Sequence, residues 1–176
     1  KVTHSMILPV SFGLPFGDHL TEDFMQAIEE SGEGERLIPG ASVHPSDSKA
    51  PEKLARYAAA GARMVKLHPA MGRYFPDDEE MFPIYRACSE LGLPIIFHGG
   101  RAGIEPESMH QYTLMRHYEA AFRAFPDVQF VLGHAGARDV EDAIGLASRH
   151  PNLWFDSHGQ GVTMLSRMVD EIGSDR

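Results

Sequence analysis

The sequence has neither the cysteines needed for an internal disulfide nor an apolar segment long enough to span a membrane. Only one of its 176 residues is cysteine, so no disulfide can form within it, and we expect an intracellular, cytoplasmic protein. No positively charged leader is present, and no apolar run approaches the roughly 18 residues of a membrane helix. Sixteen basic residues face 25 acidic ones without a basic cluster, which argues against nucleic acid or an anionic membrane as partner. A small-molecule substrate is the expected partner.

What is present is ordinary globular composition, with 43% hydrophobic and 23% charged residues. A chain of this length buries roughly two thirds of its unfolded surface, so neither disulfides nor a structural metal are needed to hold a core. We therefore expect a single domain over residues 1–176.

Apolar runs of strand length alternate with helical patterns along the whole chain. The runs are nearly continuous, which is typical of a parallel sheet covered on both faces. They lie at Met6–Phe12, Leu37–Val43, Arg63–Leu67, Pro94–Phe97, Val128–Leu132 and Leu153–Asp156. The intervening helices are predicted to start at a Thr21 cap, at Pro51 and at the acidic residues 77–80, and then to cover residues 115–125, 140–147 and 164–172.

This alternation leaves two α/β architectures open: an open doubly wound sheet, or most of a (β/α)8 TIM barrel. Six units average about 29 residues, so eight would need about 235, close to the usual barrel length of about 250. We expect about six of the eight units, with one strand of the complete fold before Lys1 and one after Arg176. The outer strands would then be open edges that permit a homo-oligomer.

Histidines follow five of the six predicted strands. In parallel α/β folds the carboxyl ends of the strands carry the site, and imidazole is both the commonest metal ligand and the usual general base. Glycines beside His98 and His134 favour a functional role for these two, whereas a role in loop structure is equally open for His44, His68 and His158. The remaining histidines, His4, His19, His110, His117 and His150, are expected at the surface.

Lys66 is a cation inside the apolar run Met-Val-Lys-Leu, where lysine is rare unless it is paired or functional. It is compatible with an internal salt bridge, a Schiff-base nucleophile, or a group of the substrate or metal site. Arg73 follows the predicted strand at 63–67, and Arg101 follows the predicted strand at 94–97. Both are candidates for binding a substrate carboxylate.

Four segments together resemble a known family. They are Gly-Ala-Arg-Met-Val-Lys-Leu-His-Pro at 61–69, Leu-Gly-Leu-Pro-Ile-Ile-Phe-His-Gly-Gly at 91–100, Pro-Asp-Val-Gln-Phe-Val-Leu-Gly-His-Ala-Gly at 126–136 and Pro-Asn-Leu-Trp-Phe-Asp at 151–156. The sequence resembles the amidohydrolase superfamily, in the amidohydrolase 2 branch that includes enzymes like aminocarboxymuconate semialdehyde decarboxylase. The resemblance extends over essentially the whole chain.

The resemblance implies a barrel in which His98 ligates a catalytic divalent metal, most often zinc, although histidine and carboxylate sites also take manganese or iron. It implies that His134 is a second ligand or the catalytic acid/base. Lys66, His68, His158 and Arg101 are expected to bind substrate.

The family's His-x-His pair on the first strand and its aspartate on the last strand have no counterpart here, and Asp175 does not replace that aspartate. Catalytic zinc takes about three protein ligands, so the metal site is expected to be incomplete in this chain. The expected function is a metal-dependent hydrolase of a small carboxylated or cyclic substrate. The alternatives are a metal-dependent decarboxylase of the same fold, a Schiff-base aldolase that uses Lys66, and a catalytically silent fragment.

Overall fold

Six short parallel strands carry the fold in the computed structural model, which describes residues 2–13 and 19–176. All have three residues, and all overlap the predicted apolar runs: β1 (Ser5–Ile7), β2 (Leu37–Pro39), β3 (Val65–Leu67), β4 (Ile95–Phe97), β5 (Phe130–Leu132) and β6 (Leu153–Phe155). β1 is shorter than the predicted Met6–Phe12, and it ends ahead of Pro9, which has no N–H to donate to a neighbouring strand.

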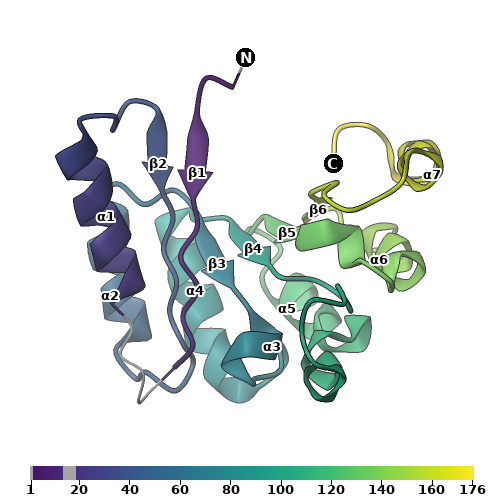
Figure 1. Cartoon of the computed structure of the whole chain (residues 1–176). Helices are drawn as coiled ribbons and strands as arrows, with labels where there is room; N and C mark the ends of the chain where they lie inside the picture. The colour runs from purple at the N-terminus through teal and green to yellow at the C-terminus, as the bar shows by residue number, and fades with distance from the viewer. Residues whose placement is uncertain (1, 14–18) are drawn as a thin grey trace.

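The strands follow one another in sequence order. β1 pairs with β2, and β3, β4, β5 and β6 form a second sheet in that order. A bridge between Ala41 and Val65 joins the two sheets, with the Ala41 N–H donating to Met64 O at 2.8 Å and the Lys66 N–H to Ala41 O at 2.7 Å. The result is one curved wall with β1 and β6 at its ends, as in part of a TIM barrel, and the α/β fold class is confirmed (Figure 1).

Helices lie between the strands and cover one side of this wall (Figure 1). Their bounds are α1 (Leu20–Ser31), α2 (Ala50–Ala59), α3 (Pro69–Gly72), α4 (Phe82–Leu91), α5 (Glu119–Ala124), α6 (Val140–Ala147) and α7 (Val162–Ile172). Short 3-10 turns occupy Glu79–Met81, Glu107–Thr113, Met115–His117 and Gly133–Gly136. None of the helices in the described ranges has the length and apolar character needed to cross a bilayer.

Two local predictions were wrong. Thr21 does not cap α1: it lies inside the helix, where its buried hydroxyl accepts from Ser42 N–H at 3.0 Å and donates to Ser42 O at 3.2 Å. The single helix expected over 115–125 is divided into a 3-10 turn and α5. In both cases tertiary contacts override a local pattern, because Thr21 ties α1 to the segment after β2 and Tyr118 is completely buried between the two pieces.

Aromatic rings fill the core behind β4 and β5. Phe97 and Phe130 come from adjacent strands and stack with centroids 6.1 Å apart, and Tyr85 on α4 meets Phe97 edge-on at 6.2 Å. Tyr118 packs edge-on against Phe97 at 5.1 Å and donates its hydroxyl to His98 O at 3.1 Å. Each fully buried ring contributes about 1.5–3 kcal/mol of transfer free energy. This packing fixes the positions of β4 and β5.

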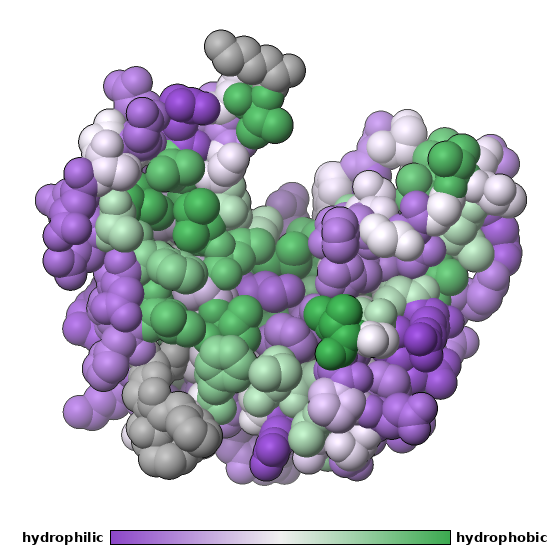
Figure 2. All heavy atoms as spheres, in the orientation of Figure 1, coloured by the Kyte–Doolittle hydropathy of each residue, from purple (hydrophilic) through white to green (hydrophobic). Residues whose placement is uncertain are grey.

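The opposite side of the wall is hollowed. Figure 2 shows the hollow between the segment that carries β1 and the C-terminal helices, with apolar residues gathered on the β1 side.

Candidate active site

The carboxyl ends of four strands are aligned. Leu67, Phe97, Leu132 and Phe155 are partners in the register of β3 to β6. Because parallel strands end at the same edge, the residues just beyond them are neighbours in space. The sequence prediction that successive strand ends meet is therefore confirmed for this half of the molecule.

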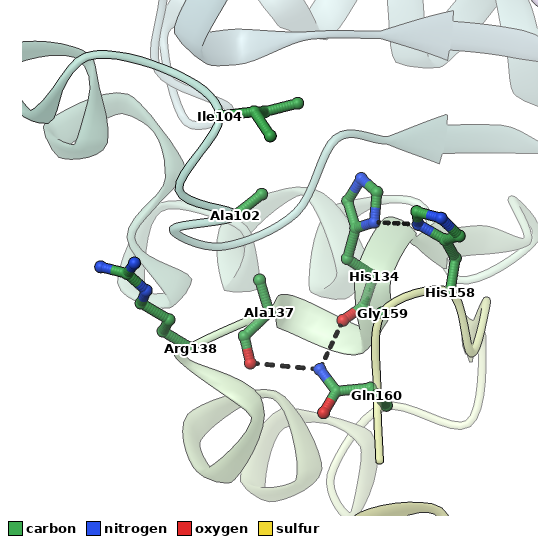
Figure 3. Close-up of a pocket in the computed structure, with 8 residues that line it drawn as sticks. All are labelled: Ala102, Ile104, His134, Ala137, Arg138, His158, Gly159 and Gln160. Atoms are coloured by element: carbon green, nitrogen blue, oxygen red, sulfur yellow. Dashed lines mark hydrogen bonds between the residues drawn. The ribbon is translucent and has the colours of Figure 1, made fainter.

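Four histidines form a continuous row along that edge. His68 stacks on His98 with centroids 3.9 Å apart and planes at 11°. The ring of His98 lies 4.8 Å from that of His134, which in turn lies 5.0 Å from that of His158. The Nδ1 atoms of His134 and His158 are 3.0 Å apart and share a hydrogen bond (Figure 3).

His44, the remaining histidine that follows a strand, stands apart from the row. Its Nδ1 is 2.7 Å from Ser46 Oγ and its Nε2 is 2.8 Å from Gly72 O. Its ring meets Tyr74 edge-on at 5.4 Å. Both ring nitrogens are thus used within the loop structure, which is the role that the sequence left open for it.

Glycines allow the ends of β4 and β5 to approach closely. A Cβ on Gly100 would lie 1.8 Å from Gly136 O, and one on Gly133 would lie 2.6 Å from Phe97 O. His134 itself has a positive φ of 57°. Asp156 stabilises this conformation, since its Oδ1 accepts the backbone N–H of His134 at 3.1 Å and that of His158 at 2.9 Å.

Burial keeps His68 and His98 neutral. Desolvation, followed by the neighbouring His98, lowers the pKa of His68 to about 3. Desolvation, followed by the charge of Lys66, lowers the pKa of His98 to about 4. At neutral pH each ring therefore keeps one nitrogen with a free lone pair, which is the form that binds metals.

Lys66 lies next to this row. Desolvation lowers the pKa of its ammonium group to about 8, and the charge of Asp156 opposes the shift. Lys66 is still mainly protonated at neutral pH, and no ion pair within 4 Å is found for it among residues 2–13 and 19–176. The salt-bridge interpretation from the sequence therefore reduces to a longer-range attraction to Asp156.

The sequence reasoning missed a buried carboxylate. The side chain of Glu105, in the loop after β4, is 1% exposed; its Oε2 lies 3.7 Å from His98 Nε2 and its Oε1 3.9 Å from His110 Nε2. Nothing in the local pattern distinguishes it from Glu107, two residues further on. His110, His117 and His150, which were expected at the surface, have side chains that are only 12–16% exposed, and each lies within 4 Å of an acidic residue.

Arg101 is bound to Asp139. Its Nε is 2.9 Å from Asp139 Oδ1, and its backbone N–H donates to Oδ2 at 3.0 Å. Arg73 is exposed and ends α3 with a φ of 58°. The structure thus gives the guanidinium of Arg101 a structural partner, and its predicted contact with substrate stays a prediction.

A pocket of about 320 Å³ opens beside the histidine row. It is lined by Ala102, Ile104, His134, Ala137, Arg138, His158, Gly159 and Gln160. Figure 3 shows His134 and His158 on one side of it and Arg138 on the other, while Gln160 donates its side-chain amide to His134 O at 2.8 Å. The pocket therefore combines an imidazole pair, a guanidinium group and apolar contacts.

His98 is the residue of the row that was predicted to bind a metal ion. No three histidine, cysteine, aspartate or glutamate side chains within these ranges converge as ligands of one ion. His98 fits as a single ligand, because it is neutral, buried at the centre of the row and without a hydrogen-bond partner at Nε2.

Three comparisons relate the chain to known proteins. It is 23% identical over 133 residues to a dihydroorotase from Pseudomonas fluorescens, covering 71% of this chain and 38% of the relative. Its fold matches a 2,6-dihydroxybenzoate decarboxylase from Rhizobium with a TM-score of 0.68 at 17% identity, covering 90% of this chain and 64% of that one. It also matches a 5-carboxyvanillate decarboxylase from Novosphingobium aromaticivorans with bound manganese, with a TM-score of 0.62 at 18% identity, covering 84% and 49%.

The chain spans less than two thirds of the length of each of these proteins. A family model described as amidohydrolase matches residues 18–176, which is most of the chain and includes all four segments that carry the resemblance. The chain therefore belongs to the amidohydrolase family.

Proposed function

We propose that this chain provides the β3–β6 part of the active site of a metal-dependent hydrolase acting on a small organic anion. The observation that carries the proposal is the row of four imidazoles beside Lys66 at the aligned strand ends. No packing requirement places imidazoles at successive strand ends, whereas metal and proton chemistry require such groups.

Burial and pocket position assign different roles to His98 and His134. His98 is buried and neutral and is assigned as a metal ligand. A divalent ion bound there would polarise a substrate carbonyl or lower the pKa of a water molecule. His134 lines the pocket and is assigned to proton transfer, and its contact with His158 fixes the orientation of its ring.

Two cations favour an anionic substrate. Lys66 lies beside His68 and His98, and Arg138 borders the pocket without an ion pair or hydrogen bond within the described ranges. Arg138, rather than the paired Arg101, is the guanidinium free to bind a carboxylate. A pocket of about 320 Å³ suits a small ligand.

Decarboxylation is the second candidate, supported by the same cations. The two solved relatives are named as decarboxylases of 2,6-dihydroxybenzoate and 5-carboxyvanillate, both aromatic carboxylates. In that reaction the bond between the ring carbon and the carboxylate would break to release carbon dioxide, and His134 would deliver a proton to the same ring carbon.

The test is metal binding and turnover in the complete protein that contains this chain, as wild type, His98→Ala and His134→Ala, with exposed His4→Ala as the matched control. Metal-stripped protein is titrated with Zn²⁺ and Mn²⁺ by calorimetry and then assayed with cyclic amides and lactones for hydrolysis and with hydroxybenzoates for release of carbon dioxide. We expect His98→Ala to lose metal and activity, and His134→Ala to lose activity but keep the metal.

Two results would contradict this assignment. If His98→Ala binds metal as tightly as His4→Ala, His98 is not a ligand. If His134→Ala loses the metal as well as the activity, His134 is a second ligand and the site holds two ions. Release of carbon dioxide without hydrolysis would favour the decarboxylase.

A further inference from the structure

Ile104 is an exposed apolar side chain at the pocket. It belongs to the loop after β4, is 80% exposed, and lines the pocket together with Ala102. Figure 3 shows these two side chains on one side of the pocket and the pair of His134 and His158 on the other. Single exposed isoleucines are common on protein surfaces, so a role for Ile104 depends on what holds it there and on what lies beside it.

The loop that carries Ile104 is fixed on both sides of this residue. Ahead of it, Arg101 is bound to Asp139: its backbone N–H donates to Oδ2 at 3.0 Å and its Nε donates to Oδ1 at 2.9 Å. Directly after it, the buried carboxylate of Glu105 accepts the backbone N–H of Ala102 at 3.1 Å. These contacts hold an exposed isoleucine in a defined position beside the pocket.

Arg138 lies against the same loop. A Cβ built on Gly103 would be 2.9 Å from Arg138 Nη2, which places the guanidinium beside the backbone that precedes Ile104. Unlike Arg101, whose guanidinium is paired with Asp139, Arg138 has no ion pair or hydrogen bond within the described ranges. A cation without a protein partner and an apolar side chain open to solvent are therefore neighbours at one pocket.

A ligand that contacts both groups has two chemical parts. A guanidinium binds a carboxylate through two parallel hydrogen bonds, whereas an isoleucine gains only from covering an apolar surface. Ala102 and Ala137 also line the pocket, and its volume of about 320 Å³ accommodates a small ring in addition to a carboxylate. A carboxylate without an apolar body would use Arg138 alone.

We infer that Ile104 is a specificity-determining residue, which contacts the apolar body of a carboxylate bound by Arg138 and so selects carboxylates with a ring or a branched chain over short ones. The inference rests on the proposed function, because it takes this pocket as the substrate site. The contact itself requires neither the metal nor turnover, so it can be measured separately from both.

The experiment compares two carboxylates that differ in their apolar part. The complete protein that contains this chain, stripped of metal, is titrated with acetate and with cyclohexanecarboxylate, and NMR shift changes give both dissociation constants. We expect the wild type to bind cyclohexanecarboxylate about 10-fold or more tightly than acetate. Ile104→Ser should lose most of this preference and Ile104→Val should keep most of it. Val2→Ser, at a 71% exposed position outside the pocket lining, is the matched control and should keep all of it.

Arg138→Gln separates the cationic contact from the apolar one. It should weaken the binding of both carboxylates by a similar factor, about 10-fold, because both lose the same charged hydrogen bonds. The ratio of the two dissociation constants should therefore stay near that of the wild type. Urea denaturation of each variant shows whether Ile104→Ser changes stability, which a contact with ligand alone does not.

Three results would overturn the inference. The first is a wild type that binds cyclohexanecarboxylate no better than acetate, which needs no variant to fold. The second is an unchanged preference in Ile104→Ser; if that variant also loses stability, Ile104 packs against protein instead of ligand. The third is unchanged binding of both carboxylates in Arg138→Gln, which would place them elsewhere.

The same measurements keep this inference apart from the proposed function. A preference that depends on Ile104, in a protein that turns over no substrate when metal is restored, would leave the inference standing and contradict the proposed function. Turnover by a protein whose preference is the same in the wild type and Ile104→Ser would contradict only the inference.

Discussion

His44 and His98 occupy equivalent places in the sequence but differ in the hydrogen bonds of their ring nitrogens. Both follow an apolar strand, β2 for His44 and β4 for His98. His44 uses both ring nitrogens on Ser46 and Gly72, whereas Nε2 of His98 has no hydrogen bond and its ring lies between two other imidazoles. The order of strands brings a histidine to the sheet edge, but its hydrogen bonds decide whether it is available to a ligand.

The same contrast separates the two sheets. The β1–β2 sheet ends in loops that are satisfied by their own hydrogen bonds, as at His44 and Asp47. The β3–β6 sheet ends in a row of packed imidazoles, and one of their buried nitrogens, His98 Nε2, has no hydrogen-bond partner within the described ranges. Polar groups left in this state cost stability, and proteins retain them mainly at functional sites.

The largest expected effect tests the close contact between β4 and β5. Gly100→Ala should lower the free energy of unfolding by about 3 kcal/mol or more, because the new Cβ would lie 1.8 Å from Gly136 O at a φ of +68°. Urea denaturation is the measurement, and Gly34→Ala, with open space around it, is the control. A cost equal to that of the control would show that this half is less tightly packed than described.

The second prediction is a substitution, His44→Ala, that should reduce stability without changing metal affinity. His44→Ala should lower the free energy of unfolding by about 2 kcal/mol, because the buried Gly72 O loses its hydrogen bond, and should leave the affinity for Zn²⁺ unchanged. Denaturation and calorimetry on one preparation give both values. A loss of metal affinity would place His44 in the site and remove the distinction drawn from His98.

Lys66→Met should stabilise the protein by about 1–2 kcal/mol at pH 7, because desolvation of the ammonium group disfavours the folded state. The pKa of Lys66 is about 8 when folded, against a usual value of 10.5. Between these values the unfolded chain binds a proton that the folded chain has lost, so wild-type stability should rise with pH.

In Lys66→Met that rise should be smaller. Denaturation curves from pH 7 to 10.5, with exposed Lys49→Met as control, measure the difference. Equal slopes in the two variants would show that Lys66 has an ordinary pKa in the folded protein.

The smallest effect concerns the loop after β2. Asp47→Asn should cost about 0.5 kcal/mol, since it removes the ion pair with Lys53 at 2.7 Å but keeps an oxygen for Lys49 N–H. The Lys53 side chain lowers the pKa of Asp47, so this contribution is complete above a pH of about 4 and is lost as the pH falls through the lower folded value. Asp170→Asn, at an exposed position, is the control for the acid titration. Equal acid sensitivity of both variants would contradict the role of the pair.

Much of the fold was predictable because it depends on periodicity. All six strands overlap the predicted runs, and Pro51 lies in the first turn of α2 as expected. The convergence of His68, His98, His134 and His158 was also predictable, because parallel strands end at one edge. Where the prediction was wrong, as at Thr21, a contact between distant segments had replaced a local interaction.

The sequence by itself determined the order of the elements, the parallel sheet, and which imidazoles reach its edge, because hydrophobic period and strand connection are local or topological properties. Only the tertiary structure decided which polar groups are free: it paired Arg101 with Asp139, left Arg138 at the pocket and placed Glu105 against His98. Hydrogen-bond partners and desolvation depend on residues that are distant in the chain, and both arise only when the sheet brings those residues together.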